Sequence, residues 1–154
     1  MKVRILNLKI CFVLLIPCFV FFLSGCAGIC PPRGVKPQTL IIQTTGYCAC
    51  GKCCGWKRSL IPPFRPVYSS GPNKGKPKKV GITASGTHAK KGTIAADTRF
   101  YPFGTVMDIP GYGIGCVEDT GGAIKGPARI DLFFNSHKEA LQWGRRRLSV
   151  WVWK

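Results

Sequence analysis

Short apolar segments separated by turn residues recur along most of the chain. The first is "TLIIQTTGY" (residues 39–47), which is rich in β-branched residues and ends near a glycine. Runs of this length and composition, bounded by glycine or proline, are typical of β-strands. Five more follow: "GTIAAD" (92–97), "GTVMDIP" (104–110), "GIGCVED" (113–119), "RIDLFF" (129–134) and "LSVWVW" (148–153). Six short strands predict a compact all-β barrel, with a β-sandwich as the alternative.

One segment has the pattern of a helix. In "SHKEALQWG" (136–144), Ser136 is followed three residues later by Glu139, and Gly144 ends the segment. Serine followed by glutamate at this spacing is a capping box, and glycine commonly ends a helix. We therefore expect a single short helix before the last strand.

The chain begins with a basic leader, "MKVRILNLK", and an apolar run over residues 10–23 that ends in "LSGC". The run is shorter than the roughly 20 residues that a membrane-spanning helix needs, and it fits the core of a secretory signal. "LSGC" resembles the lipobox of bacterial lipoproteins. We expect residues 1–25 to be a lipoprotein signal peptide, Cys26 to carry lipid, and residues 26–38 to form a tether. An ordinary signal peptide or a poor anchor helix is the alternative.

Between the first two predicted strands, residues 56–80 are rich in proline, glycine and basic residues and show no sustained periodicity. This composition predicts a long surface loop with a solvated charge, and a lid over a substrate is the alternative. Residues 39–154 would then form one domain that carries this loop.

The chain is strongly basic, with 23 Lys and Arg residues against six Asp and Glu residues. Such a charge usually suggests nucleic acid. An exported lipoprotein rarely meets nucleic acid, so we expect no such partner. Anionic lipid headgroups and the carboxylates of peptidoglycan stems are the expected partners.

Six cysteines lie beyond the lipobox: Cys30, Cys48, Cys50, Cys53, Cys54 and Cys116. The number is even, and export implies an oxidising compartment, so we expect disulfides whose pairing the sequence does not give. A tetra-thiolate zinc knuckle in "YCACGKCCGW" is the alternative, although four sulfurs within seven residues are more crowded than in most structural zinc sites.

Three of the six acidic residues fall within residues 118–131, around a glycine-rich turn. In "RIDLFF", alternation along a strand places Asp131 on the face opposite the apolar Ile130 and Leu132. In "GCVED", the same rule pairs Asp119 with Val117. Asp119 and Asp131 could therefore face one cleft, with Asp97 as a third member, and crowding would raise the pKa of at least one carboxyl. From spacing alone, turn-capping acids and an Asp131–Arg129 pair are the simpler interpretation.

Four segments in order, "TASGTHAKKGTIAAD", "YPFGT", "EDTGGAIKG" and "RIDLFF", resemble the 3D domain, named for its three aspartates. The same domain forms the catalytic part of the membrane-bound lytic transglycosylase A family. The resemblance implies a six-stranded double-psi β-barrel. It also implies cleavage of the bond between N-acetylmuramic acid and N-acetylglucosamine in peptidoglycan, without water.

Carried onto this chain, the resemblance makes Asp97, Asp119 and Asp131 the three aspartates, with Asp131 as acid and base and the other two tuning it. We further expect Gly121, Gly122 and Lys125 to bind substrate, with no cofactor and no metal. His88 and His137 are expected at the surface.

The expected protein is an envelope lipoprotein, facing the periplasm from the outer membrane if the cell has one, that degrades peptidoglycan as a lytic transglycosylase. A hydrolase on the same fold and a non-catalytic glycan-binding module are the alternatives. The full-length transglycosylases carry a second domain that forms the other wall of the groove. Here residues 56–80 are the candidate for part of that wall; a shallow cleft acting alone and vestigial catalysis remain the other options.

Overall fold

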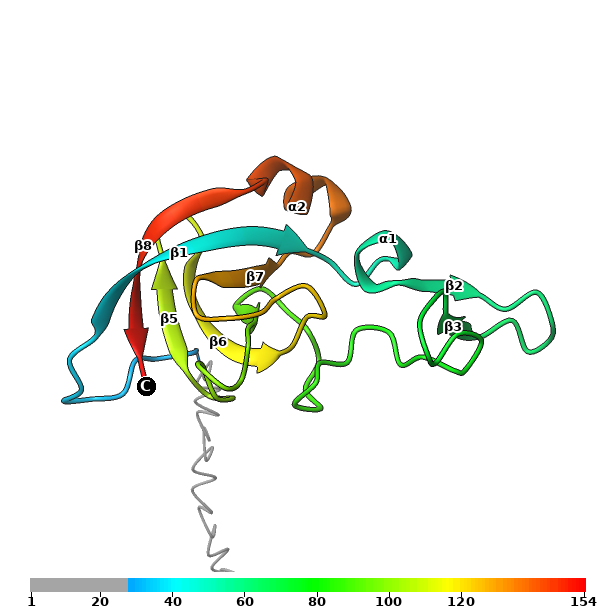
Figure 1. The fold of residues 1–154 in the computed structure, drawn as a ribbon, viewed down its shortest axis with the longest axis horizontal. Helices are drawn as coiled ribbons and strands as arrows, with labels where there is room; N and C mark the ends of the chain where they lie inside the picture. Colours follow the sequence, from blue (N-terminus) through cyan, green and yellow to red (C-terminus); the bar gives the residue numbers. More distant parts are fainter. Residues whose placement is uncertain (1–27) are drawn as a thin grey trace, which may run out of the picture.

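The computed structural model describes residues 28–154, so the predicted signal peptide and Cys26 lie outside the described residues. Its main body is a closed barrel of six strands in the order β1-β7-β4-β6-β5-β8 (Figure 1). None of the helices within residues 28–154 has the length and apolar character needed to cross a membrane. The barrel strands are β1 (Gln38–Tyr47), β4 (Thr93–Ala95), β5 (Val106–Ile109), β6 (Gly113–Asp119), β7 (Arg129–Phe133) and β8 (Arg146–Trp153).

The barrel is mixed rather than purely antiparallel. Strand β1 runs parallel to β7, and β4 runs parallel to β6, while the remaining neighbours are antiparallel. Parallel neighbours cannot be joined by a tight hairpin, so each parallel pair brings together segments that are distant in sequence. Each of the six segments predicted as strands overlaps one barrel strand. The predicted all-β, six-stranded double-psi barrel is confirmed.

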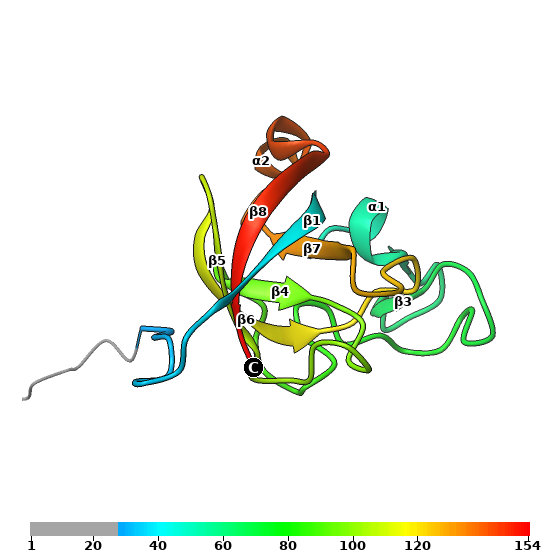
Figure 2. The same cartoon turned by 60° about the vertical axis from the view of Figure 1, so that its left-hand side comes forward.

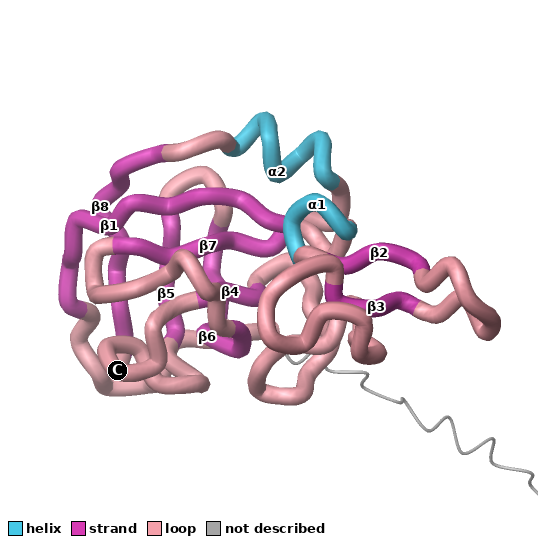
Figure 3. Tube along the Cα trace, turned by 45° about the vertical axis from the view of Figure 1, so that its right-hand side comes forward, coloured by secondary structure: helices cyan, strands magenta, loops and turns pink. Residues whose placement is uncertain are grey.

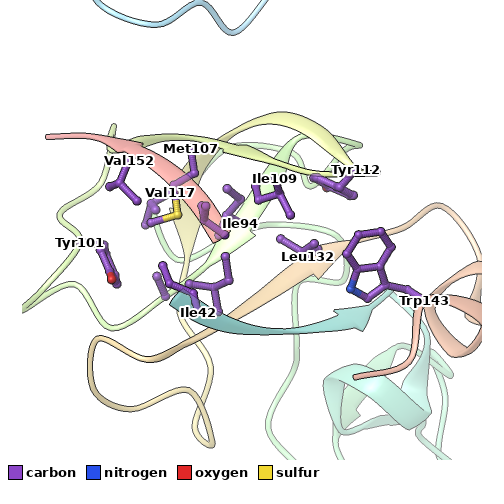
Figure 4. Close-up of a cluster of buried hydrophobic side chains, with 13 residues drawn as sticks. Ile42, Ile94, Tyr101, Met107, Ile109, Tyr112, Val117, Leu132, Trp143 and Val152 are labelled. Atoms are coloured by element: carbon purple, nitrogen blue, oxygen red, sulfur yellow. The ribbon is translucent and has the colours of Figure 1, made fainter. Parts of the chain in front are cut away.

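Alternating side chains of the strands fill the barrel (Figure 4). The polar Thr44 is fully buried among them, and its hydroxyl accepts a hydrogen bond from Trp143 Nε1 at 3.1 Å. A buried hydroxyl needs such a partner to offset its lost hydration. The buried cluster comprises Ile42, Ile94, Ala96, Tyr101, Met107, Ile109, Tyr112, Val117, Ile130, Leu132, Trp143, Val150 and Val152.

The predicted helix is present as α2 (His137–Trp143), which follows β7 and leads into β8. Ser136 Oγ accepts a hydrogen bond from the backbone N–H of Glu139 at 3.2 Å, as the capping box predicts. A second, shorter helix, α1 (Gly51–Cys54), follows β1 and ends at Gly55, whose φ of 60° is left-handed. Glycine adopts this conformation without strain, which explains why the helix stops there.

Residues 56–80 are more ordered than the predicted loop. They contain β2 (Trp56–Arg58) and β3 (Pro66–Tyr68), which pair in an antiparallel sheet that projects beyond α1, away from the barrel (Figures 1 and 3). Val67 is buried, and Lys78 Nζ lies 4.4 Å from the centroid of the Tyr68 ring. The strands are too short for periodicity to be seen in the sequence, so the predicted long surface loop contains a small sheet that the sequence did not indicate.

Candidate functional site

A cleft of about 270 Å³ opens on one side of the barrel, between the strands and the segment that follows the β2–β3 sheet. Its floor includes Tyr47 of β1, Ala95 of β4 and Phe133 of β7, and its wall includes Cys53 and Cys54 of α1. Figure 2 shows β4 and β6 side by side, which follows their parallel pairing. Asp119 and Asp131 both line this cleft, so the structure brings two of the three predicted acids together.

Asp131 is half-buried at the cleft. It is register partner to Thr45 across the parallel pair β1–β7, and Thr45 Oγ1 donates a hydrogen bond to its Oδ1 at 2.9 Å. Burial raises the pKa of Asp131, the hydrogen bond from Thr45 opposes the rise, and the charge of Asp119 adds to it. Desolvation disfavours a charged carboxylate, so this group retains a proton more readily than an exposed aspartate does.

Asp119 reaches the cleft through an irregularity in β6. The register between β4 and β6 passes from Ile94–Val117 to Ala95–Asp119, which leaves Glu118 as an extra residue. Such a bulge re-aims the side chains that follow it. Val117 lies in the barrel core, whereas Asp119 lines the cleft beside Ala95, so the prediction that these two residues share a face is wrong.

Three donors hold the carboxylate of Asp119 in place. Its Oδ1 accepts hydrogen bonds from the backbone N–H groups of Ala84 at 3.0 Å and Thr120 at 2.9 Å. Its Oδ2 accepts a hydrogen bond from the Tyr47 hydroxyl at 2.9 Å. Burial and the neighbouring charge of Asp119 raise the pKa of Tyr47, so its hydroxyl keeps its proton and remains a donor.

Asp97 does not belong to the cleft, contrary to the prediction that it is a third member. Its carboxylate pairs with the Arg99 guanidinium at 2.7 Å and accepts a hydrogen bond from the backbone N–H of Gly126 at 2.9 Å. The hydrogen bonds from Arg99 and Gly126 hold the pKa of Asp97 well below its usual range. A carboxyl of this kind is a poor proton donor. It connects the turn after β4 to the glycine-rich turn before β7.

Of the predicted substrate-binding residues, Gly121 and Gly122 line the cleft, whereas Lys125 is exposed and does not. The cations at the cleft are instead Lys78 and Lys79, from the end of the segment predicted as a solvated loop. That segment therefore supplies part of the cleft wall, which is one of the options the sequence left open.

Thr45 and Tyr47 are contacts that the sequence analysis missed. Both lie on β1, in the polar end of "TLIIQTTGY", and alternate with the buried Thr44 and with Gly46. Side chains two residues apart on a strand share a face. This alternation was the signal that could have placed them beside the acids.

The cysteines do not form the expected disulfides. All six cysteines within residues 28–154 are free thiols. Three of them, Cys48, Cys50 and Cys53, gather around His137 near the cleft wall and are the described residues best suited to hold a metal ion. His137 was expected at the surface, but it is half-buried and its ring faces these thiols.

Two curated proteins are similar in sequence to part of this chain. A segment of 76 residues is 41% identical to the cell wall-binding protein YocH of Bacillus subtilis (strain 168), covering 47% of this chain and 26% of that protein. A second relative from the same strain, YabE, is 36% identical over 74 residues, covering 46% of this chain and 18% of its own length. The chain thus matches about a quarter or less of each relative.

Among solved structures, MltA from E. coli is similar at 25% identity with a TM-score of 0.39, covering 47% of this chain and 27% of that one. Residues 92–154, which span β4 to β8 and hold the three aspartates predicted for the site, match the family of the 3D domain. This match confirms the resemblance to the 3D domain that the sequence motifs indicated, over residues 92–154.

Proposed function

We propose that this protein is a peptidoglycan lytic transglycosylase, which cleaves the bond between N-acetylmuramic acid and N-acetylglucosamine and leaves an anhydro-muramic product. The observation that carries the proposal is the state of Asp131: a carboxyl with a raised pKa, in a cleft, beside a second aspartate. A carboxyl whose pKa is raised holds its proton more readily than an exposed aspartate does, and protonation of a glycosidic oxygen requires such an acid.

In the proposed reaction, Asp131 gives its proton to the glycosidic oxygen as the bond from that oxygen to the muramic acid ring breaks. The bonding electrons leave with the oxygen, and positive charge develops on the ring, as in an oxocarbenium ion. The primary hydroxyl of the same sugar then attacks the charged carbon. Its proton passes to the Asp131 carboxylate, which restores the acid. No water enters, and one carboxyl serves in both steps.

The neighbouring groups suit this chemistry. Thr45 orients one oxygen of Asp131 through the 2.9 Å hydrogen bond, which leaves the other oxygen to carry the transferable proton. The carboxylate of Asp119, held by Tyr47 and two backbone N–H groups, supplies negative charge where the oxocarbenium-like ring develops positive charge. Asp97 is a positioning residue in this scheme, acting through the turn that contains Gly126.

The rim of the cleft fits a glycan that carries acidic peptides. Lys78 and Lys79 line it, and the whole chain has a net charge of +17. Positive groups at a cleft raise the local concentration of an anionic ligand. The lipid anchor at Cys26 and a place in the cell envelope complete the proposal, and they rest on the sequence pattern of residues 1–26.

A second candidate is a glycan-binding module without catalysis. It is favoured by the similarity to YocH of B. subtilis, which is a cell wall-binding protein. In that case the cleft would hold the glycan, and Asp131 would serve as a hydrogen-bonding group only. A hydrolase, in which Asp119 activates a water molecule, is the third candidate.

Product analysis separates the three candidates. The full chain, purified in detergent, is incubated with purified peptidoglycan, and the soluble muropeptides are analysed by mass spectrometry beside those from Asp131→Asn. Anhydro-muramic products that disappear in Asp131→Asn support the transglycosylase, whereas reducing ends mean a hydrolase. If the wild type and Asp131→Asn both sediment with the cell wall to the same extent and neither releases any product, the binding module is favoured.

A further inference from the structure

The group of three thiols and one imidazole beside the cleft has no role in the proposed reaction. Cys48 follows β1 directly, Cys50 caps α1, and Cys53 lies within α1. His137 is the first residue of α2, 84 positions after Cys53. One ligand atom from each residue lies within 4.8 Å of all the others.

The spacing of these four atoms is that of a tetrahedral zinc site. Ligands at about 2.3 Å (sulfur) and about 2.0 Å (nitrogen) from a tetrahedral centre lie about 3.5 to 3.8 Å from one another. Here Cys48 Sγ and Cys53 Sγ are 3.7 Å apart. The distances from His137 Nδ1 to the three sulfurs are 3.3 Å for Cys53, 3.6 Å for Cys50 and 4.0 Å for Cys48.

We propose that Cys48, Cys50, Cys53 and His137 bind one zinc ion in a structural site. Thiolate and imidazole ligands suit zinc rather than magnesium or calcium, which prefer oxygen. Four protein ligands fill a tetrahedral shell, so no position is open for water or substrate, as is usual for structural sites. This ligand set differs from both sequence-based expectations, which were disulfides and a site of four thiolates.

The surrounding structure holds the ligands together before any ion binds. At the end of β1, the Gly46 backbone lies so close to α2 that a Cβ at this position would be 2.8 Å from the carbonyl oxygen of Ala140. The backbone N–H of Phe134 donates to the Tyr47 carbonyl at 2.8 Å, next to Cys48. At the start of α1, the backbone N–H of Cys53 donates a hydrogen bond to Cys50 Sγ at 3.5 Å. Hydrogen bonds to the ligating atoms orient them toward the metal.

The adjacent Cys54 serves a different purpose and makes a matched control. Its thiol donates a hydrogen bond to the Cys48 carbonyl at 3.1 Å and lines the cleft, and it is not a member of the four-residue group. Because Cys53 and Ala49 also line the cleft, a zinc ion would fix one wall of it to α2. The ion would thus link segments far apart in sequence, which stabilises the folded chain.

The test is the metal content of the full chain, purified in detergent with a thiol reductant and without chelators, and then supplied with zinc sulfate. Mass spectrometry of the metal should find one zinc per chain in the wild type and in Cys54→Ser. Cys50→Ser and His137→Ala should lose most of it. X-ray absorption at the zinc edge should show three sulfur ligands and one nitrogen at the distances of a tetrahedral site. Zinc removal by a chelator should lower Tm.

Two results would overturn the proposal. One is a wild-type chain that takes up no zinc under reducing conditions, with alkylation showing either free thiols or a disulfide among Cys48, Cys50 and Cys53. The other is zinc bound by four sulfurs in the wild type, with the ion lost from Cys54→Ser. Neither outcome depends on activity, and neither requires the ligand variants to fold, because both can be read from the wild type and Cys54→Ser.

Discussion

Thr45 and Asp131 face each other across the parallel pair β1–β7, and the Thr45 hydroxyl donates a 2.9 Å hydrogen bond to the Asp131 carboxyl. The two residues are 86 positions apart in sequence, and the parallel pairing of β1 with β7 brings them together. In this way a strand that carries no acidic residue sets the properties of the proposed catalytic acid. The hydrogen bond opposes the effect of burial on the pKa of Asp131.

Replacement of Thr45 by valine should raise the pKa of Asp131 further, because the bond that favours the charged form is lost while burial remains. A general acid with a higher pKa stays protonated to a higher pH, so the alkaline limb of the plot of kcat/KM against pH should shift to higher pH. Thr45→Ser keeps the hydroxyl and should keep the wild-type limb. An identical pH profile for Thr45→Val would show that this limb does not report Asp131.

Asp131→Asn should abolish product release and yet fold at least as stably as the wild type at neutral pH. The folded-state pKa of Asp131 is raised, so the contribution of this group to stability is fully present below its unfolded-state pKa of about 3.9. That contribution is lost as the pH rises through the folded-state pKa. Asparagine carries no charge and avoids this loss.

Thermal unfolding of Asp131→Asn and the wild type at pH 4 and pH 8 checks this sign. The difference in Tm should favour the variant more at pH 8 than at pH 4. Asp108→Asn, on β5 outside the cleft, is the control and should show no such gain. A variant that is less stable at pH 8 than at pH 4, relative to the wild type, would contradict the raised pKa.

The opposite pH dependence is expected for Asp97, whose pKa is lowered by Arg99 and Gly126. Its contribution to stability is present above the unfolded-state pKa and is lost as the pH falls through the lower folded-state pKa. Asp97→Asn should therefore lower Tm at pH 7, and the deficit should shrink as the pH falls below about 4. A deficit of the same size at pH 7 and pH 2 would mean that packing, rather than charge, is what Asp97 supplies.

Local patterns in the sequence predicted the barrel well because each strand and the cap of α2 are encoded within a few residues. Ser136 and Glu139, for example, form the expected cap. The site was predicted less well, because it depends on how strands pair. The extra residue at Glu118, which brings Asp119 into the cleft, exists only relative to Ala95 on the neighbouring strand.

The same limit applies to Asp97 and to the cysteines. The position of Asp97 in the sequence does not reveal that Arg99 and the backbone N–H of Gly126 donate hydrogen bonds to its carboxylate. Nor does the cysteine cluster reveal His137, which is 84 positions away from Cys53 and reaches it through the packing of α2. Contacts of this kind depend on the strand register of the whole barrel, which local patterns in the sequence do not reveal.

The glycine-rich turn offers a comparison between two adjacent residues that differ in the space around them. A Cβ at Gly121 would be 2.6 Å from Cγ1 of Ile124, whereas a Cβ at Gly122 would meet nothing within 4 Å. Ile124 is buried and β-branched, so it cannot turn aside freely. Gly121→Ala should cost about 1–3 kcal/mol of stability, as overpacking usually does, while Gly122→Ala should cost less than about 0.5 kcal/mol. Denaturant unfolding measures both. Equal stabilities for the two variants would show that the turn moves to accept the methyl group. If the turn also positions the substrate, Gly121→Ala should raise KM.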